Sequence, residues 1–201
     1  PQFGADGDVI DIALHTVKIQ NWDKTVSVIP THKLIDSTFR NWRFMSESGG
    51  RRIKRSLFID MNSISLCNTE TLDRFRKFEL IQEYIDRKQK EVSAHNESID
   101  TSELINGRSL TNIGTFRAYI EAYLQNNTKI HKDMTFLVRQ LEPSAQGLPI
   151  QIYVFTNDTD WIRYEEIQAN IFDHLLAVIP EFGLKIFQNP TGKDFSNIGN
   201  S

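Results

Sequence analysis

The spacing of apolar residues changes along this chain, and no other feature constrains its fold as much. Before Pro30 these residues recur at every second position, as at Ile10 and Ile12 and at Val26 and Val28. This alternation is typical of β-strands, because successive side chains of a strand point to opposite faces. Pro30 has no backbone N–H and is expected to end the last of these strands. The segment therefore predicts a small antiparallel sheet or barrel whose interior Val26 and Val28 fill.

After residues 46–50, a polar stretch that ends in two glycines, the spacing becomes mostly helical. Such a stretch is typical of a hinge between domains. Residues 51–60 are again strand-like, whereas Leu72, Phe75 and their successors follow at three- and four-residue steps and predict a helix over 71–90.

The remaining pattern predicts an α/β domain. Its expected elements are a helix around Phe116–Leu124, a hairpin that joins strands at 134–141 and 149–155, a helix from about Trp161 and a short strand at 184–187. With residues from about 92 to 130 left out as an insertion, the order from residue 51 is strand, helix, strand, strand, helix, strand. This order is the ferredoxin-like arrangement.

Composition narrows the function classes. The chain has 201 residues, of which 39% are hydrophobic and 24% charged, the balance of an ordinary globular protein. Cys67 is its one cysteine, which excludes an intrachain disulfide and fits a reducing compartment. There is no run of ~20 apolar residues and no signal sequence, so the chain as given is expected to be soluble.

A search for catalytic, cofactor and metal motifs predicts none of these sites. The five histidines (His15, His32, His95, His131 and His174) are dispersed along the sequence. Asn157–Asp160 resembles the start of a calcium loop but lacks its glycine and glutamate, so it predicts a turn and a helix N-cap. Thr191-Gly192-Lys193 lacks the first glycine of a phosphate loop, and Cys67 has no activating histidine nearby. We therefore expect no catalytic residue, no cofactor, no metal and no enzyme activity.

One basic patch could hold an anion. It consists of Arg51-Arg52-Ile53-Lys54-Arg55, preceded by Arg40 and Arg43 and close in sequence to Trp22, Phe39, Trp42 and Phe44. Basic grooves with stacking aromatic rings bind single-stranded nucleic acid. The favoured interpretation is that the basic side chains point away from a core formed by Ile53 and Leu57, where they make ion pairs between domains or subunits.

Residues 7–30 resemble the cytoplasmic β-domain of the small-conductance mechanosensitive channel family. The likeness rests on GDVIDIALHTVKIQ at Gly7–Gln20, on Asp23-Lys24 and on TVSVIP at Thr25–Pro30. The positions that match the family's pattern are Gly7, Val9, Ile12, Thr16, Asp23, Ile29, Pro30, Leu34 and Asn41. Thr31-His32-Lys33 is similar to the miniconductance branch, whose members are longer and carry an insertion.

The resemblance implies an α+β fold. Residues 1–46 would form a partial β-barrel (Sm/SH3-like) domain, and residues 51–188 a ferredoxin-like α/β domain with a helical insertion at about 92–130. Residues 189–201 would be a flexible tail. Because neither the transmembrane helices nor the first barrel strand is among these residues, the chain is expected to be a piece of a longer channel.

The resemblance also implies a function by assembly. Members of the family are homo-heptamers on the cytoplasmic side of the inner membrane, and membrane tension opens them to release ions and small solutes during hypo-osmotic shock. The partners would be identical subunits and the membrane, with no nucleic acid. A soluble nucleic-acid-binding or adaptor module is the alternative, and an enzyme is a third interpretation that lacks a convergent polar cluster.

Overall fold

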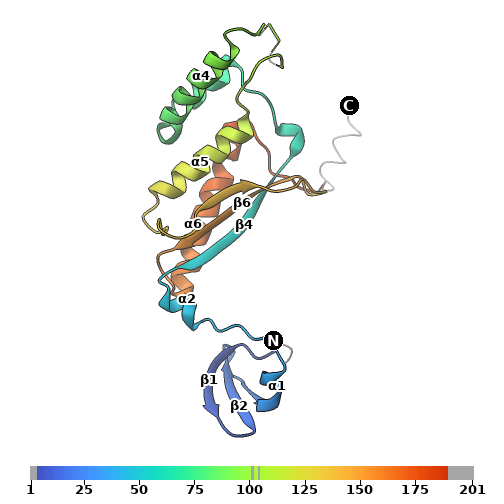
Figure 1. Ribbon diagram of the computed structural model, residues 1–201, viewed down its shortest axis with the longest axis vertical. Helices are drawn as coiled ribbons and strands as arrows, with labels where there is room; N and C mark the ends of the chain where they lie inside the picture. Colours follow the sequence, from blue (N-terminus) through green and yellow to red (C-terminus); the bar gives the residue numbers. More distant parts are fainter. Residues whose placement is uncertain (1–3, 101, 104, 190–201) are drawn as a thin grey trace, which may run out of the picture. The chain divides into compact units, whose positions relative to one another are not determined.

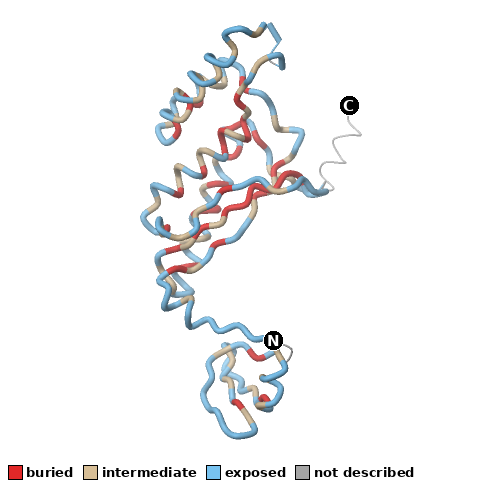
Figure 2. The backbone as a smooth tube through the Cα atoms, viewed as in Figure 1, coloured by how far each residue is buried: buried red, intermediate tan, exposed pale blue. Residues whose placement is uncertain are grey.

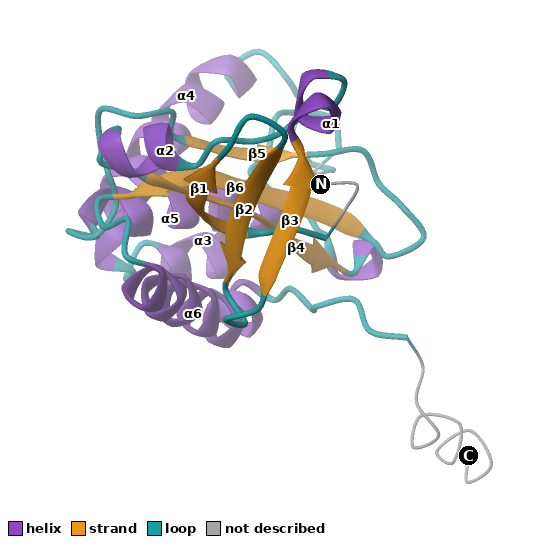
Figure 3. Ribbon diagram, turned by 90° about the horizontal axis from the view of Figure 1, so that it is seen from below, coloured by secondary structure: helices purple, strands orange, loops and turns teal. Residues whose placement is uncertain are grey.

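The chain divides into two compact units in a computed structural model that describes residues 4–100, 102–103 and 105–189 (Figure 1). The first unit is Pro1–Glu47 and the second is Ser48–Ser201. Each unit has its own antiparallel sheet, and no strand is shared between the two sheets (Figure 3). The mixed α+β class expected from the sequence is thus confirmed.

The first unit is a three-stranded sheet followed by two short helices. Its elements are β1 (Gly7–Ile12), β2 (Thr16–Asn21), β3 (Val26–Pro30), α1 (Thr31–Ile35) and α2 (Arg43–Glu47). The strands pair in the order β1-β2-β3, and β3 ends at Pro30 as predicted. Helix α2 was not expected from the sequence. The described part of this unit forms an open sheet and no closed barrel.

The expectation that Val26 and Val28 fill the interior is wrong. These two side chains are 51% and 55% exposed, whereas Ile29 is 4% exposed and pairs with Val17 on β2, which is 5% exposed. Alternation along a strand sorts its side chains into two sets, but it does not say which set faces the interior. Here the buried set is the one that contains Ile29.

The second unit contains the larger sheet, with strands in the order β4-β6-β5. Its strands are β4 (Arg51–Ile59), β5 (Leu137–Gln140) and β6 (Leu148–Thr156). The predicted hairpin is confirmed, because β5 and β6 pair antiparallel and Ser144 bridges to Gly147 in the turn. The predicted strand at 184–187 is reduced to a single bridge between Ile186 and Ile59 at the free edge of β4.

Helices and short 3₁₀ turns make up the rest of the second unit. They are η1 (Met61–Ser63), α3 (Thr69–Phe75), η2 (Glu79–Ile81), α4 (Gln82–Asn96), α5 (Asn112–Asn126), α6 (Trp161–Val178) and η3 (Ile179–Phe182). The single helix predicted over 71–90 is wrong, because the chain breaks between α3 and α4. A 3₁₀ turn also places residues three apart on one side, so Phe78 and Ile81 keep a helix-like spacing through the break.

Helices α5 and α6 cover one face of the sheet (Figure 1). The helix predicted around Phe116–Leu124 is confirmed as α5, and its side chains Phe116, Ile120 and Leu124 have no exposed surface. The first sheet-covering helix is thus α5 and not the segment 71–90. Residues 92–130, expected as an insertion, therefore include a helix of the main core.

The core of the second unit is the largest buried region in the described chain, as the red segments of Figure 2 show. Phe182 lies at its aromatic centre, with the rings of Phe75 and Phe116 each 5.2 Å away and that of Tyr119 5.3 Å away. Within the described ranges, no helix has both the length and the apolar character needed to cross a membrane.

Replacing Phe182 by alanine should destabilise the second unit by about 3–5 kcal/mol, because it removes a buried ring and leaves a cavity among the neighbouring rings. Ile105→Ala is the matched control. Ile105 is 83% exposed, so its truncation should change the free energy of unfolding by less than about 0.5 kcal/mol. Urea denaturation followed by circular dichroism measures both changes, and equal effects would contradict the assigned core.

Candidate functional site

The turn between β2 and β3 is held by the side chains of Asn21 and Asp23. Asn21 Oδ1 accepts from the Asp6 N–H at 3.0 Å, and its Nδ2 donates to Thr25 Oγ1 at 2.9 Å and Ser27 Oγ at 2.8 Å. Asp23 accepts from the hydroxyl and the backbone N–H of Thr25, and these bonds lower the pKa of the Asp23 carboxyl. The Lys24 N–H also donates to the Asn21 carbonyl at 2.9 Å, which closes the turn.

Gly7 allows β1 and β2 to approach closely. A Cβ atom at this position would lie 1.9 Å from the carbonyl oxygen of Gln20, which is less than any non-bonded contact permits. Gly7 pairs with Asn21, the same residue that holds the turn. A glycine is therefore required at position 7, because the backbone of β2 leaves no room for a side chain there.

The surface of the first unit is unusually apolar. Among its described hydrophobic side chains, those classed as buried are Ala5, Val17 and Ile29. The large exposed ones are Val9, Ile10, Ile12, Leu14, Trp22, Val26, Val28, Ile35, Phe39, Trp42 and Phe44. Apolar surface exposed to this extent is typical of a site where another protein surface or a membrane binds. A small open sheet can bury little of its own surface, so this unit is the candidate assembly surface.

The basic patch at β4 splits between the two faces of the sheet. Arg51 lies over the Tyr164 ring at 4.5 Å and Arg55 over the Phe172 ring at 4.3 Å, both on the α6 side. Arg52 lies over the Tyr153 ring at 5.6 Å. The alternate basic residues Arg52 and Lys54 thus point away from the face of Ile53, whereas Arg51 and Arg55 share that face.

The other aromatic and basic residues assigned to that patch belong to the first unit. Arg43 pairs with Glu47 at 2.7 Å along α2.

In the second unit, Tyr164 of α6 donates its hydroxyl to the carbonyl of Arg52 at 3.0 Å, and burial raises the pKa of that hydroxyl. These contacts use the arginines to bind α6 to the sheet.

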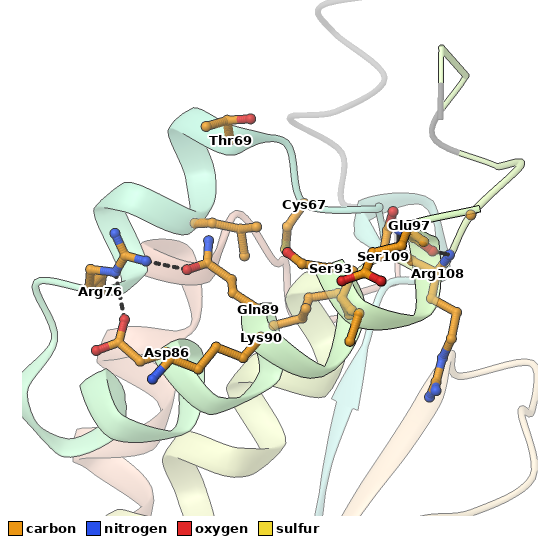
Figure 4. A pocket seen from close by; sticks show the side chains of 16 residues that line it. Cys67, Thr69, Arg76, Asp86, Gln89, Lys90, Ser93, Glu97, Arg108 and Ser109 are labelled. Atoms are coloured by element: carbon orange, nitrogen blue, oxygen red, sulfur yellow. Dashed lines mark hydrogen bonds and ion pairs between the residues drawn. The ribbon is translucent and has the colours of Figure 1, made fainter. Parts of the chain in front are cut away.

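A cavity of about 880 Å³ lies between α3, α4 and residues 107–110 (Figure 4). At one end Arg76 pairs with Asp86 at 2.8 Å and donates to Gln89. At the other end the Asn96 amide donates to and accepts from the backbone of Arg108, both at 2.9 Å. Basic and acidic groups are mixed along the lining, so the cavity shows no preference for a ligand of either charge.

Cys67 lines this cavity but is poorly suited to nucleophilic chemistry. Its side chain is buried, its N–H donates to the carbonyl of Leu110 at 2.8 Å, and burial raises the pKa of the thiol to about 11. Since the thiolate is the reactive form, this thiol is almost entirely protonated at neutral pH.

The histidines are placed apart, and no three His, Cys, Asp or Glu side chains in the described residues form a group that could hold a metal ion. The His174 ring and the Tyr119 hydroxyl share a hydrogen bond of 2.7 Å, and the His174 ring stacks on the Tyr123 ring.

The Asn157–Asp160 segment is a turn and helix N-cap as predicted, because the Asp160 side chain accepts from the Arg163 N–H at 3.0 Å. Thr191-Gly192-Lys193 lies outside the described residues.

The sequence comparison that decides the family covers the first unit. Residues 3–44 match the family described as "Mechanosensitive ion channel, beta-domain". Residues 3–44 are therefore similar to the β-domain of mechanosensitive channels. The resemblance seen at Gly7–Pro30 is thus confirmed, and the exposed apolar side chains belong to a domain from a membrane channel family.

Solved channels share the fold of the β-domain and of the unit that follows it. The cryo-EM structure of Arabidopsis thaliana MSL1 matches with a TM-score of 0.55 and 13% identity over 92% of this chain and 50% of that one. The crystal structure of Helicobacter pylori MscS in its closed state matches with a TM-score of 0.52 and 12% identity, over 92% of this chain and 52% of that one. The chain therefore spans about half the length of these channels.

Gly7→Ala should open the β1–β2 pair, because its methyl group would overlap the Gln20 carbonyl. The expected result is faster amide hydrogen exchange at the paired positions Val9 and Ile19. Asp8→Ala changes the neighbouring, exposed residue and should leave that exchange unchanged. Unchanged protection in Gly7→Ala would contradict the close approach.

Cys67 should react slowly with iodoacetamide at neutral pH. A pKa raised from 9.0 to about 11 leaves roughly a hundredfold less thiolate than in an unperturbed cysteine, and burial hinders access further. A Cys67→Ser variant with a new exposed cysteine at Ser98 is the control and should react at the rate of a free thiol. Labelling of Cys67 at the control rate would show that the thiol is accessible and ionised.

Proposed function

We propose that this chain is the cytoplasmic part of a mechanosensitive channel of the miniconductance branch. Tension in the membrane opens the complete channel, which releases ions and small solutes under hypo-osmotic stress. The observation that carries the proposal is the β-domain match at residues 3–44, together with the apolar surface that this domain exposes.

In this proposal the chain contributes assembly and a cytoplasmic vestibule. Identical subunits, seven in the complete channel, cover the exposed apolar side chains of one another's β-domains. Side chains such as Ile12 and Leu14, which are 73% and 84% exposed, lose their contact with water on assembly, which stabilises the oligomer. The channel lies in the inner membrane with this part on the cytoplasmic side, and it needs no cofactor, metal or catalytic residue.

Patch-clamp recording of the complete gene product tests this function. Produced in bacterial spheroplasts that lack their own mechanosensitive channels, it should pass stepwise current when suction is applied. Protein that reaches the membrane but passes no current under tension up to the lytic limit would overturn the proposal.

A variant on the β-domain surface tests the role in assembly. Val28 is 55% exposed in the single chain, so Val28→Asp should leave the subunit folded while it places a charge in the subunit contact. We expect loss of the cross-linked oligomer and of tension-activated current. Val28→Thr has nearly the same shape without the charge and should retain most of both. Equal assembly of the two variants would exclude this surface from the contact.

A further inference from the structure

Among the helices of the described residues, none covers the second face of the sheet of the second unit. The opposite face packs on α5 and α6, where Ile53, Ile150 and Ile152 have no exposed surface. Because side chains alternate along a strand, the uncovered face carries the residues between these positions. We call it the open sheet face, defined by Arg52, Lys54, Leu137, Arg139, Tyr153 and Phe155.

The open sheet face is positively charged. Arg52, Lys54 and Arg139 are exposed, and the positions of β4, β5 and β6 on this face include no Asp or Glu. In the described residues, none of these three cations forms an ion pair within the chain. Its apolar part consists of Leu137, which is 39% exposed, and the half-buried rings of Tyr153 and Phe155.

The outer side of α6 has the complementary character. Ile162, Glu166, Ala169, Asp173 and Leu176 follow one another at three- and four-residue steps and are all exposed, so they form one stripe along the helix. Ile162 is 80% and Leu176 44% exposed. Neither carboxylate of this α6 stripe forms an ion pair in the described chain.

The two surfaces lie on opposite sides of the same domain, because α6 packs on one face of the sheet and the open sheet face is the other. They cannot meet within one chain. Two copies can meet, since the α6 stripe of one presents acidic and apolar groups to the basic and apolar groups of the other. Such a head-to-tail contact repeats from copy to copy and closes when the rotation between copies allows a ring.

We propose that the open sheet face of one copy binds the α6 stripe of the next copy. This contact deepens the proposed function and rests on it, since it names the surfaces by which the second units of neighbouring subunits associate. The cations pair with Glu166 and Asp173 of the neighbouring copy, while Ile162 and Leu176 cover the exposed apolar groups on the sheet.

A second copy fits this face better than nucleic acid does. The face of the Tyr153 ring is covered by the guanidinium of Arg52, and the Tyr153 and Phe155 rings meet edge to face at 70°. Arg139 already donates to Gln151 Oε1 from two nitrogens, at 3.0 and 2.8 Å. One face of the Tyr153 ring is therefore already occupied, and the net charge of −3 opposes binding to a polyanion.

Charge exchange tests the contact in the full 201-residue chain. Arg52→Glu with Lys54→Glu makes the sheet face acidic, and Glu166→Lys with Asp173→Lys makes the α6 stripe basic. Each double variant alone brings like charges together and should weaken self-association by at least about tenfold in sedimentation equilibrium. An equimolar mixture of the two should recover the pairwise affinity between copies, because each mixed contact again joins opposite charges.

A matched control keeps the number of reversed charges constant. Lys77→Glu with Lys90→Glu reverses two exposed cations that lie on neither surface, so self-association should stay within about twofold of the unchanged chain. The same result for the sheet-face variant as for this control would overturn the proposal.

The remaining outcomes separate this contact from the proposed function. If charge reversal has no effect while Val28→Asp abolishes association, the β-domain assembles the subunits and this inference fails alone. A chain that stays monomeric at every concentration overturns the contact, whereas tension-activated current from the complete protein still supports the channel function. Binding of polyuridylate that weakens with salt and is lost in the sheet-face variant would assign the open sheet face to nucleic acid instead.

Discussion

Stronger burial on one side of the β4–β6 ladder than on the other determines the organisation of the second unit. Ile53, Ile150, Ile152 and Val154 have no exposed surface, and α5 and α6 align on the face that they form. The alternation that buries these four residues turns Arg52, Lys54 and Tyr153 to the opposite face. The same constraint thus produces both the core and the basic surface that we assign to a neighbouring copy.

The first unit leaves many of its apolar side chains exposed in the single chain. Its open sheet buries Val17 and Ile29 but leaves Leu14 and Ile35 more than four-fifths exposed. A surface of this kind agrees with the proposed role of the first unit in assembly. In the cavity beside α4, Arg76 and Asp86 pair with each other and the Cys67 thiol is protonated at neutral pH.

Much of the fold could be predicted from local patterns. Pro30 ended its strand, and the segments that became α5 and α6 were recognised from apolar spacing. The pattern did not reveal the break between α3 and α4, since a 3₁₀ turn preserves the spacing at Phe78. It also did not tell which helix covers the sheet, because periodicity shows that a helix has a buried side but not what lies against it.

The sequence by itself predicted most of the strands and helices and the resemblance of residues 7–30 to the channel β-domain, because strand alternation, helical spacing and Pro30 act over a few neighbouring residues. Only the tertiary structure decided which alternating set is buried, and it chose Ile29 over Val28 and divided the arginines of β4 between two faces. The physical reason is that burial depends on pairing and packing between distant segments, such as β4 with β6 and both with α6. Those contacts also decide which charged side chains stay exposed on the open sheet face, where a neighbouring copy could bind them.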